Sequence, residues 1–193
     1  MQVVDAGSGP QAAADTTPVV RLGPAHAAPY RALMLEAYER HPDAFTSSVA
    51  ERADLPLAWW AGRLAAEPLA SELVFGRFVD GELAGVAGLS FESREKARHK
   101  ATLFGMYVPE RFRKLGLGRQ LVAAALQHAR SRADTLLVQL TVTAGNVPAR
   151  TLYKSCGFEP FGIEPFAVQT GAGYVSKVHM WCKLRAAAGE DAA

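Results

Sequence analysis

The sequence predicts an α/β domain built around a mixed sheet, and three features of its 193 residues indicate this fold class. Segments with the composition of strands alternate with segments of helical periodicity, which is typical of layered α/β domains. Asp80-Gly81, between two apolar runs, predicts an antiparallel hairpin. A strand–helix–strand unit over residues 101–142 predicts parallel pairing with a right-handed crossover. A hairpin beside such a unit makes the sheet mixed.

One strand and two helices are expected before the hairpin. The strand is Val19–Leu22, and apolar residues at helical spacing predict a helix over Ala27–Arg40. This helix should end at His41, because the residue before Pro42 disfavours the helical conformation. A second helix is expected over Pro56–Glu67, with one proline in its first turn and another just beyond its end.

The rest of the chain supplies six more expected strands and two more helices. The hairpin strands are Glu72–Val79 and Glu82–Glu92, and a third long strand covers Ala101–Val108. Apolar residues at helical spacing predict a helix from Leu117 to about Arg132. The remaining elements are a buried strand, a short helix closed by a C-cap glycine, and two final strands: 136–142, 148–156, 159–168 and 174–184.

Composition indicates an ordinary globular protein and excludes several classes. The chain is 49% hydrophobic and 21% charged, with a net charge of +2. Its basic residues form no clear basic and aromatic stripe, so no nucleic-acid partner is expected. No apolar run approaches the roughly 20 residues that cross a bilayer, so no membrane partner is expected either. The two cysteines lack C-x-x-C spacing, so we expect no metal and a reducing, cytoplasmic location.

The expected organisation is one domain over residues 19–184. Residues 1–18 are rich in Ala, Gly, Ser, Asp and Pro, and we interpret them as a disordered leader without signal-peptide character. Residues 185–193 are interpreted as a flexible tail.

The most informative segment is the loop between the strand ending at Val108 and the helix beginning near Leu117. Gly116 and Gly118 lie at the mouth of that helix, where unpaired N–H groups and the helix dipole favour an anion. Basic residues crowd the same segment, namely Arg111, Arg113, Lys114 and Arg119. The physical interpretation is a pyrophosphate-binding turn. No Walker A spacing is present, and the three-glycine dinucleotide spacing is incomplete.

Two motifs together resemble those of the GNAT (N-acetyltransferase) superfamily. The segment 113–118, RKLGLG, is similar to its Arg/Gln-x-x-Gly-x-Gly/Ala signature, and it follows a strand as expected. The segment 146–158, NVPARTLYKSCGF, is similar to its Asn-x-x-Ala-x-x-x-Tyr-x-x-x-Gly-Phe signature. The similarity spans roughly residues 72–184. It implies a GNAT-type α/β fold: a mixed, mostly antiparallel sheet of about seven strands flanked by about four helices.

The resemblance also implies acetyl-CoA as co-substrate and assigns residues to it. The strand before the glycine turn would pair with the pantetheine arm, and an amide near Val108 would stabilise the developing oxyanion. The residues so assigned to the cofactor are Met106, Tyr107, Val108, Arg113, Lys114, Leu115, Gly116, Leu117, Gly118, Arg119 and Asn146. Tyr153 resembles the tyrosine that protonates the departing thiolate.

Several assignments keep an alternative. Asn146 is also a common residue before a helix, and a tyrosine such as Tyr153 often serves only as core. The general base is open between Glu92, His99 and a water chain. The basic run 94–100 would contact the 3′-phosphate of CoA or an acidic substrate, or it would form a solvated loop.

The leading functional interpretation is an enzyme, an acetyl-CoA-dependent N-acetyltransferase that acetylates a primary amine of a small molecule or protein by direct transfer. The alternative is a non-catalytic acyl-CoA-binding sensor with the same fold. A homodimer is compatible with the sequence, and the choice between acetyl and a longer acyl group stays open. Acceptor specificity is expected in the N-terminal helices, in residues 93–100 and in a loop over residues 164–173.

Overall fold

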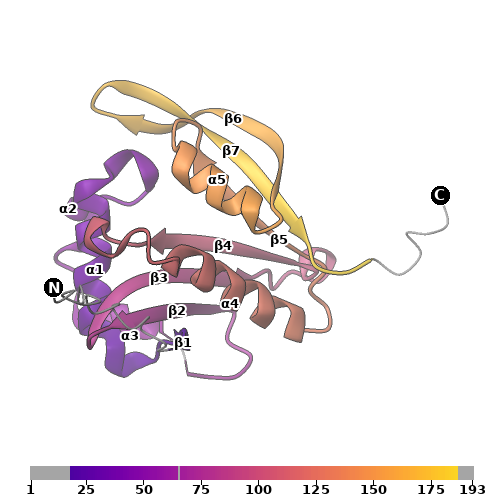
Figure 1. Ribbon diagram of the computed structural model, residues 1–193, viewed down its shortest axis with the longest axis horizontal. Helices are drawn as coiled ribbons and strands as arrows, with labels where there is room; N and C mark the ends of the chain where they lie inside the picture. The colour runs from indigo at the N-terminus through magenta and orange to yellow at the C-terminus, as the bar shows by residue number, and fades with distance from the viewer. Residues whose placement is uncertain (1–17, 65, 187–193) are drawn as a thin grey trace, which may run out of the picture.

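The computed structural model describes residues 18–64 and 66–186, and there it confirms the predicted α/β architecture (Figure 1). Seven strands form one sheet in the order β1-β2-β3-β4-β5-β7-β6, and every neighbouring pair is antiparallel except β4 and β5. The strands are β1 (Val20–Arg21), β2 (Glu72–Val79), β3 (Glu82–Phe91), β4 (Lys100–Tyr107), β5 (Leu137–Thr143), β6 (Glu159–Thr170) and β7 (Gly173–Lys183).

Helices cover both faces of this sheet, and each face has its own hydrophobic core. The helices are α1 (Ala27–Arg40), α2 (Val49–Arg52), α3 (Leu57–Gly62), α4 (Leu117–Ser131) and α5 (Val147–Ser155). α4 and α5 contribute to one core, and α1 and α3 contribute to the other. Because both faces are covered, β2 and β3 carry nearly continuous buried runs rather than alternating ones.

The local signals in the N-terminal part explain most of its elements. Asp80 and Gly81 have φ angles of 50° and 81°, which are the positive values that a tight hairpin turn requires. The predicted Ala27–Arg40 helix is confirmed with the same bounds. The helix expected over Pro56–Glu67 is too long, since α3 ends at Gly62, a residue with low helix propensity.

The four-residue α2 helix was not predicted, although it carries a start signal. Ser48 accepts a hydrogen bond from the backbone amide of Glu51, and the Glu51 side chain accepts one from the Ser48 amide. This reciprocal capping box holds the segment between α1 and α3. The loop expected over residues 164–173 is also wrong, because β6 continues to Thr170 and β7 begins at Gly173.

The two parallel strands stay together only over their first residues. β4 pairs with β5 from Lys100 to Thr102, and the rest of β4 has no partner on that side within the described chain. β4 also carries a bulge opposite β3, near Gly105, whose φ angle is 57°. The pairing between β4 and β5 therefore ends well before β4 does (Figure 1).

The predicted leader and tail fall almost entirely outside the described residues, which begin at Pro18 and end at Ala186. Within the described chain, no helix is both long enough and apolar enough to span a bilayer.

Candidate active site

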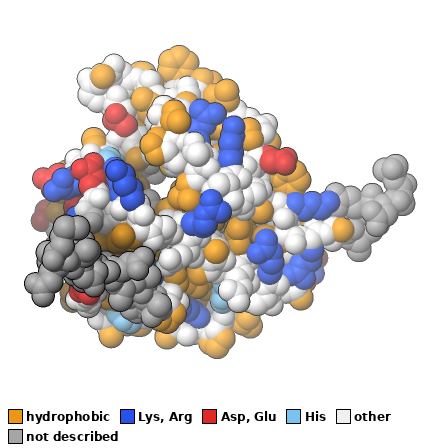
Figure 2. Space-filling view, viewed as in Figure 1, with side chains coloured by type: hydrophobic (Ala, Val, Ile, Leu, Met, Phe, Trp, Pro, Cys, Tyr) orange, Lys and Arg blue, Asp and Glu red, His pale blue; other side chains and the backbone are white. Residues whose placement is uncertain are grey.

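A cleft of about 610 Å³ lies between the end of β4, the N-terminus of α4 and one side of α5. Figure 2 shows a hollow on this side of the molecule with Lys and Arg side chains around it. All the predicted site residues except Leu115 line the cleft: Met106, Tyr107, Val108, Arg113, Lys114, Gly116, Leu117, Gly118, Arg119, Asn146 and Tyr153. The Leu115 side chain is 56% exposed and lies outside it. Residues far apart in the sequence thus meet in one place.

The mouth of α4 presents a row of unpaired backbone amides. Within the described chain, the amides from Lys114 to Arg119 donate no hydrogen bond, and no side chain caps the helix. Lys114 and Gly116 have positive φ angles of 67° and 75°, which turn the chain sharply at this point. Amides arranged in such a turn, at the positive end of a helix dipole, form an anion-binding site. The residues present therefore fit a pyrophosphate group.

The charges around the cleft favour the same kind of ligand. Arg113, Lys114 and Arg119 line it, and no carboxylate of the described residues does. Lys114 makes no ion pair within the described chain, so its ammonium group is available. Arg119 donates a 3.0 Å hydrogen bond to Ser155 Oγ, which fixes it against the end of α5. Arg113 lies 3.3 Å from Glu110 Oε1, which balances part of its charge. An anionic ligand would still meet three cations here.

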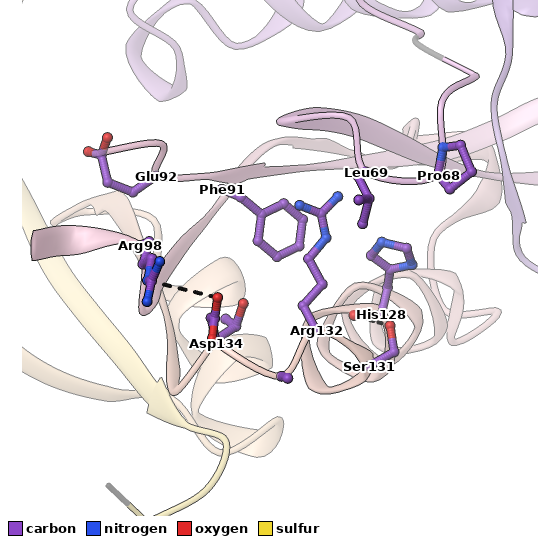
Figure 3. Close-up of a pocket in the computed structure, with 11 residues that line it drawn as sticks. Pro68, Leu69, Phe91, Glu92, Arg98, His128, Ser131, Arg132 and Asp134 are labelled. Atoms are coloured by element: carbon purple, nitrogen blue, oxygen red, sulfur yellow. Dashed lines mark hydrogen bonds and ion pairs between the residues drawn. The ribbon is translucent and has the colours of Figure 1, made fainter. Parts of the chain in front are cut away.

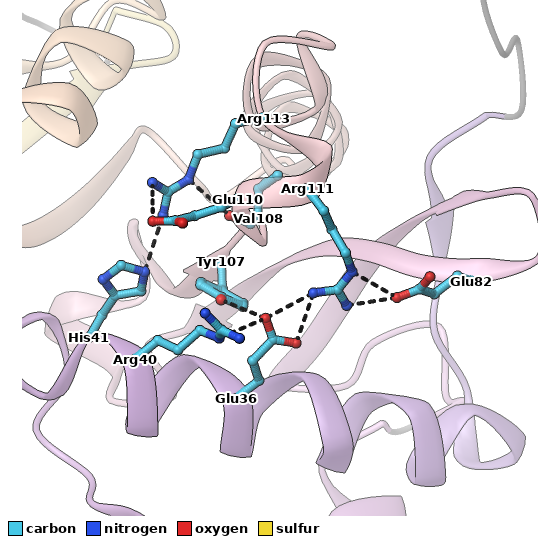
Figure 4. Close-up of polar contacts among 9 residues, drawn as sticks. All are labelled: Glu36, Arg40, His41, Glu82, Tyr107, Val108, Glu110, Arg111 and Arg113. Atoms are coloured by element: carbon cyan, nitrogen blue, oxygen red, sulfur yellow. Dashed lines mark hydrogen bonds and ion pairs between the residues drawn. The ribbon is translucent and has the colours of Figure 1, made fainter.

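Arg111 does not join this mouth, which corrects the expectation from the sequence. Its guanidinium lies 2.9 Å from Glu36 Oε1 and 2.6 Å from Glu82 Oε1, on the side of α1 (Figure 4). Tyr107 also donates a 3.1 Å hydrogen bond to Glu36. Burial acts to raise the pKa of Glu36, but the bonds from Arg111 and Tyr107 outweigh it and lower that pKa. This cluster ties α1 to the end of β4.

His41 lies between the cleft and a second pocket. Arg113 Nη2 lies 3.1 Å from His41 Nε2, and because arginine can only donate, Nε2 is the acceptor in this contact. Figure 4 shows His41 reaching from the end of α1 toward Arg113. The second pocket has a volume of about 580 Å³ and adjoins the cleft. Among the described residues, His41 is the one ionisable side chain that lines both the cleft and this second pocket.

Tyr153 presents its hydroxyl to the cleft from a buried ring. The residue is 8% exposed, and its ring packs edge-on against Phe158. The hydroxyl forms no hydrogen bond within the described chain, and burial raises its pKa to about 12, with a smaller contribution from Cys156. The hydroxyl therefore stays protonated at neutral pH.

Asn146 caps the N-terminus of α5, as its position before a helix suggests. Its Oδ1 accepts a 3.2 Å hydrogen bond from the Ala149 amide and caps α5. Capping uses the side-chain oxygen and leaves the amide NH₂ for a ligand in the cleft, which Asn146 also lines. The contact with pantetheine stays a prediction.

Neither candidate base from the sequence lies near this cleft. The Glu92 amide bonds to the Lys100 carbonyl, and His99 precedes β4 directly, so both lie at the far end of that strand. From Lys100 to Val108 a strand spans roughly 25 Å at ~3.3 Å per residue. Glu92 instead borders a separate pocket of about 460 Å³ near the end of α4 (Figure 3).

The basic run 94–100 likewise lies at the far end of β4 from the α4 mouth. Arg94 pairs with Glu92, whose pKa it lowers to about 2, and Arg98 lies 3.8 Å from Asp134. A contact of this run with the 3′-phosphate of CoA or with an acidic substrate stays a prediction.

A metal site is not evident in the part of the chain that the structure describes. No group of three or more His, Cys, Asp or Glu side chains there is arranged to hold a metal ion. What the cleft offers is hydrogen-bond donors and fixed positive charge.

Comparison with known proteins places this arrangement in a family context. Residues 32–158 match the profile described as "Acetyltransferase (GNAT) family". The chain is 30% identical over 122 residues to L-amino acid N-acetyltransferase AaaT of Escherichia coli, covering 63% of this chain and 73% of that protein. It is 30% identical over 141 residues to [Ribosomal protein bS18]-alanine N-acetyltransferase of Salmonella typhimurium, covering 70% and 95%.

A solved structure shows the same fold. It is yncA, a putative acetyltransferase from Salmonella typhimurium with its cofactor acetyl-CoA, which superposes with a TM-score of 0.74 at 20% identity. The match covers 93% of this chain and 100% of that structure.

Proposed function

The chain belongs to the Acetyltransferase (GNAT) family, and we propose that it is an N-acetyltransferase that moves an acetyl group from acetyl-CoA to a primary amine. The observation that carries the proposal is the turn from Lys114 to Arg119. Its backbone amides are unpaired, it opens onto a cleft without carboxylates, and it matches the family signature. The whole reaction would take place within residues 19–184.

Acetyl-CoA supplies the activated acetyl group. The amides of residues 114–119 and the Lys114 ammonium would hold its pyrophosphate, and the unpaired side of β4 at Met106 and Tyr107 would hydrogen-bond the pantetheine arm. Within the described chain the Val108 amide has no hydrogen-bond partner, so it is free to donate to the acetyl carbonyl oxygen. A donor placed there stabilises negative charge as it develops on that oxygen.

The transfer forms one bond and breaks another. The neutral amine nitrogen bonds to the acetyl carbonyl carbon, the carbon–sulfur bond breaks, and the thiol leaves with one proton. Tyr153 would donate that proton or a hydrogen bond to the sulfur. The ammonium form of the amine first loses one proton to solvent, and the nitrogen loses a second proton to water as the new bond forms, while Tyr153 regains its own proton from solvent. His41, which borders both spaces, would take the second proton only when its Nε2 is not bonded to Arg113.

The relatives act on different amines, and their names carry no acceptor over to this chain. The two free cysteines of the described chain support the proposed reducing, cytoplasmic location. A homodimer also stays part of the proposal.

The proposal is tested by incubating the purified protein with acetyl-CoA and a panel of primary amines. Free thiol and the acetylated product are measured together. Thiol release that depends on an amine, with the matching acetylated product, supports the enzyme. Tight acetyl-CoA binding with no acetylated product across small-molecule and peptide amines would favour the sensor alternative.

A further inference from the structure

A small pocket lies on the α1 face of β4, beside the bulge that adjoins the cleft. Its volume is about 220 Å³, below the ~300–1,000 Å³ typical of drug-sized ligands. It borders Phe104 and Gly105 of β4, and the cleft borders the next residue, Met106. Phe45 lines both spaces. A molecule seated in this pocket therefore reaches the end of β4, where the acetyl carbonyl would be held.

Five aromatic rings line the pocket beside polar and charged side chains. The rings come from α1, the loop after it, α3 and β4: Tyr30, Tyr38, Phe45, Trp59 and Phe104. Tyr38 and Phe45 meet edge to face at 5.3 Å, and Trp59 meets the fully buried Trp60 at 5.1 Å. Because each ring has a neighbour that fixes it, the walls are preformed. A pocket of this size and lining suits one ring or one branched alkyl group.

Two arginines face these rings, and only one of them is paired with a carboxylate of the described residues. The guanidinium groups of Arg52 and Arg63 lie 4.8 Å and 5.2 Å from the centre of the Trp59 ring. Arg63 forms a 2.6 Å ion pair with Glu72. Arg52 is half-buried and bonds only to the neutral Ser47 Oγ, at 3.1 and 3.3 Å, with no ion pair in the described chain. The pocket therefore carries one uncompensated positive charge.

We propose that this pocket binds the acceptor amine, and that the acceptor carries an aromatic or branched apolar group together with a carboxylate held by Arg52. The inference rests on the proposed acetyl transfer and names the substrate class for it. The Arg63 guanidinium lies 5.2 Å from the centre of the Trp59 ring and 5.7 Å from that of Phe104, so the apolar group would lie against the other aromatic rings of the pocket. The carboxylate would take the free N–H groups of Arg52. A planar guanidinium matches a carboxylate in geometry as well as charge.

The same residues argue against two other classes of small-molecule acceptor, polyamines and small polar amines. A polyamine would be attracted to aromatic rings, but Arg52 and Arg63 already lie against the Trp59 ring and would repel a second cation. A small polar amine would leave the aromatic walls in contact with water. The neighbouring pocket beside His41 and Asp43 lacks this aromatic lining, so it discriminates less by shape.

Binding of a non-reacting acceptor analogue tests this separately from catalysis. We would titrate 3-phenylpropionate and its uncharged amide, 3-phenylpropionamide, against the protein by ligand-observed NMR, without acetyl-CoA. The wild-type protein should bind the acid about tenfold more tightly, the size of one charge-assisted hydrogen-bonded pair. The variant Arg52→Gln should bind acid and amide equally, and Arg52→Lys should keep part of the preference. Arg98→Gln, an exposed arginine at the far end of β4, is the matched control and should behave as wild type.

Each outcome decides the inference. Equal binding of acid and amide by the wild-type protein would show that Arg52 does not bind the carboxylate. No binding of either would show that the pocket does not bind the apolar group. If Arg52→Gln still prefers the acid, another group binds the carboxylate and the assignment to Arg52 is wrong. Should Arg52→Gln fail to fold, the wild-type and Arg52→Lys comparison still decides it. Failure here with amine-dependent thiol release intact leaves the proposed function standing.

Discussion

Replacing Tyr153 with Phe isolates the proposed proton donor, because the substitution removes one oxygen and keeps the ring. The Tyr153 hydroxyl has no hydrogen-bond partner in the described chain, and the ring keeps its contact with Phe158. Removing an unpaired polar atom from a buried position should therefore change the free energy of unfolding by less than about 1 kcal/mol. The variant should fold and bind acetyl-CoA as the wild type does.

The expected effect is on turnover. General acid catalysis contributes ~10²–10⁴-fold, and a thiol with a pKa of about 8.5 leaves more easily than an alcohol or amine. The lower end of that range is expected, so kcat should fall about 100-fold at neutral pH. As the pH rises above about 9, the thiolate leaves without a proton, and the deficit should shrink.

Stopped or continuous thiol detection from pH 6.5 to 9.5 measures this, with thermal unfolding as the check on folding. Tyr174→Phe is the matched control, because Tyr174 is 60% exposed on the β6–β7 hairpin beside Phe166. A Tyr153→Phe enzyme with full kcat would refute the assignment of the proton donor. A deficit that stays constant across the pH range would show that the tyrosine acts in another way.

The structure carries three further predictions about stability. Asn146→Ala removes the cap of α5 and should lower the unfolding free energy by about 1 kcal/mol, whereas Asn146→Ser should keep most of it; thermal unfolding of the pair tests this. Because the pKa of Glu36 is lower in the folded protein than in the unfolded chain, ionised Glu36 stabilises the fold at pH values above its unfolded pKa. This stabilisation is lost as the pH falls, so Arg111→Gln should make the free energy of unfolding depend less on pH in the acid range. An unchanged dependence on pH would argue against the pairing. The pKa values of Tyr30 and Tyr153 are raised to about 12, chiefly by burial. Their contribution to the free energy of unfolding is therefore complete below pH ~10 and should be lost between pH 10 and 12. Chemical unfolding over this range measures it, and a flat profile would contradict it.

Periodicity and turn chemistry were sufficient to predict most of the fold. The bounds of α1 and the β2–β3 hairpin follow from local signals, namely helical spacing ended by His41-Pro42 and an Asp80-Gly81 turn. α2 was missed because four residues cannot show a helical period, even though Ser48 and Glu51 formed a capping box. Short elements held by tertiary contacts leave only a weak trace in a sequence.

The site was predicted through its motifs, and the errors concern residues outside them. Arg111 looked like part of the basic mouth, but its partners Glu36 and Glu82 are distant in the chain, and no local pattern reveals such pairs. Glu92 was a candidate base because it ends the strand before β4. The length of β4, which separates Glu92 from the glycine turn, was the signal that excluded it. The pocket around Arg52 depends on the packing of α1, α2 and α3 and could not be read from the sequence.

The most direct test of the central claim is calorimetric titration of acetyl-CoA into three proteins: wild type, Gly116→Asp and Gly81→Asp. Both glycines have similar positive φ angles, 75° and 81°, and both have open space where a side chain would begin. Aspartate tolerates this conformation better than most residues, so both variants should fold. Only Gly116→Asp puts a carboxylate at the mouth of α4. The account predicts at least tenfold weaker binding for Gly116→Asp and wild-type affinity for Gly81→Asp. Equal affinity in all three, or no binding to the wild type, would contradict it.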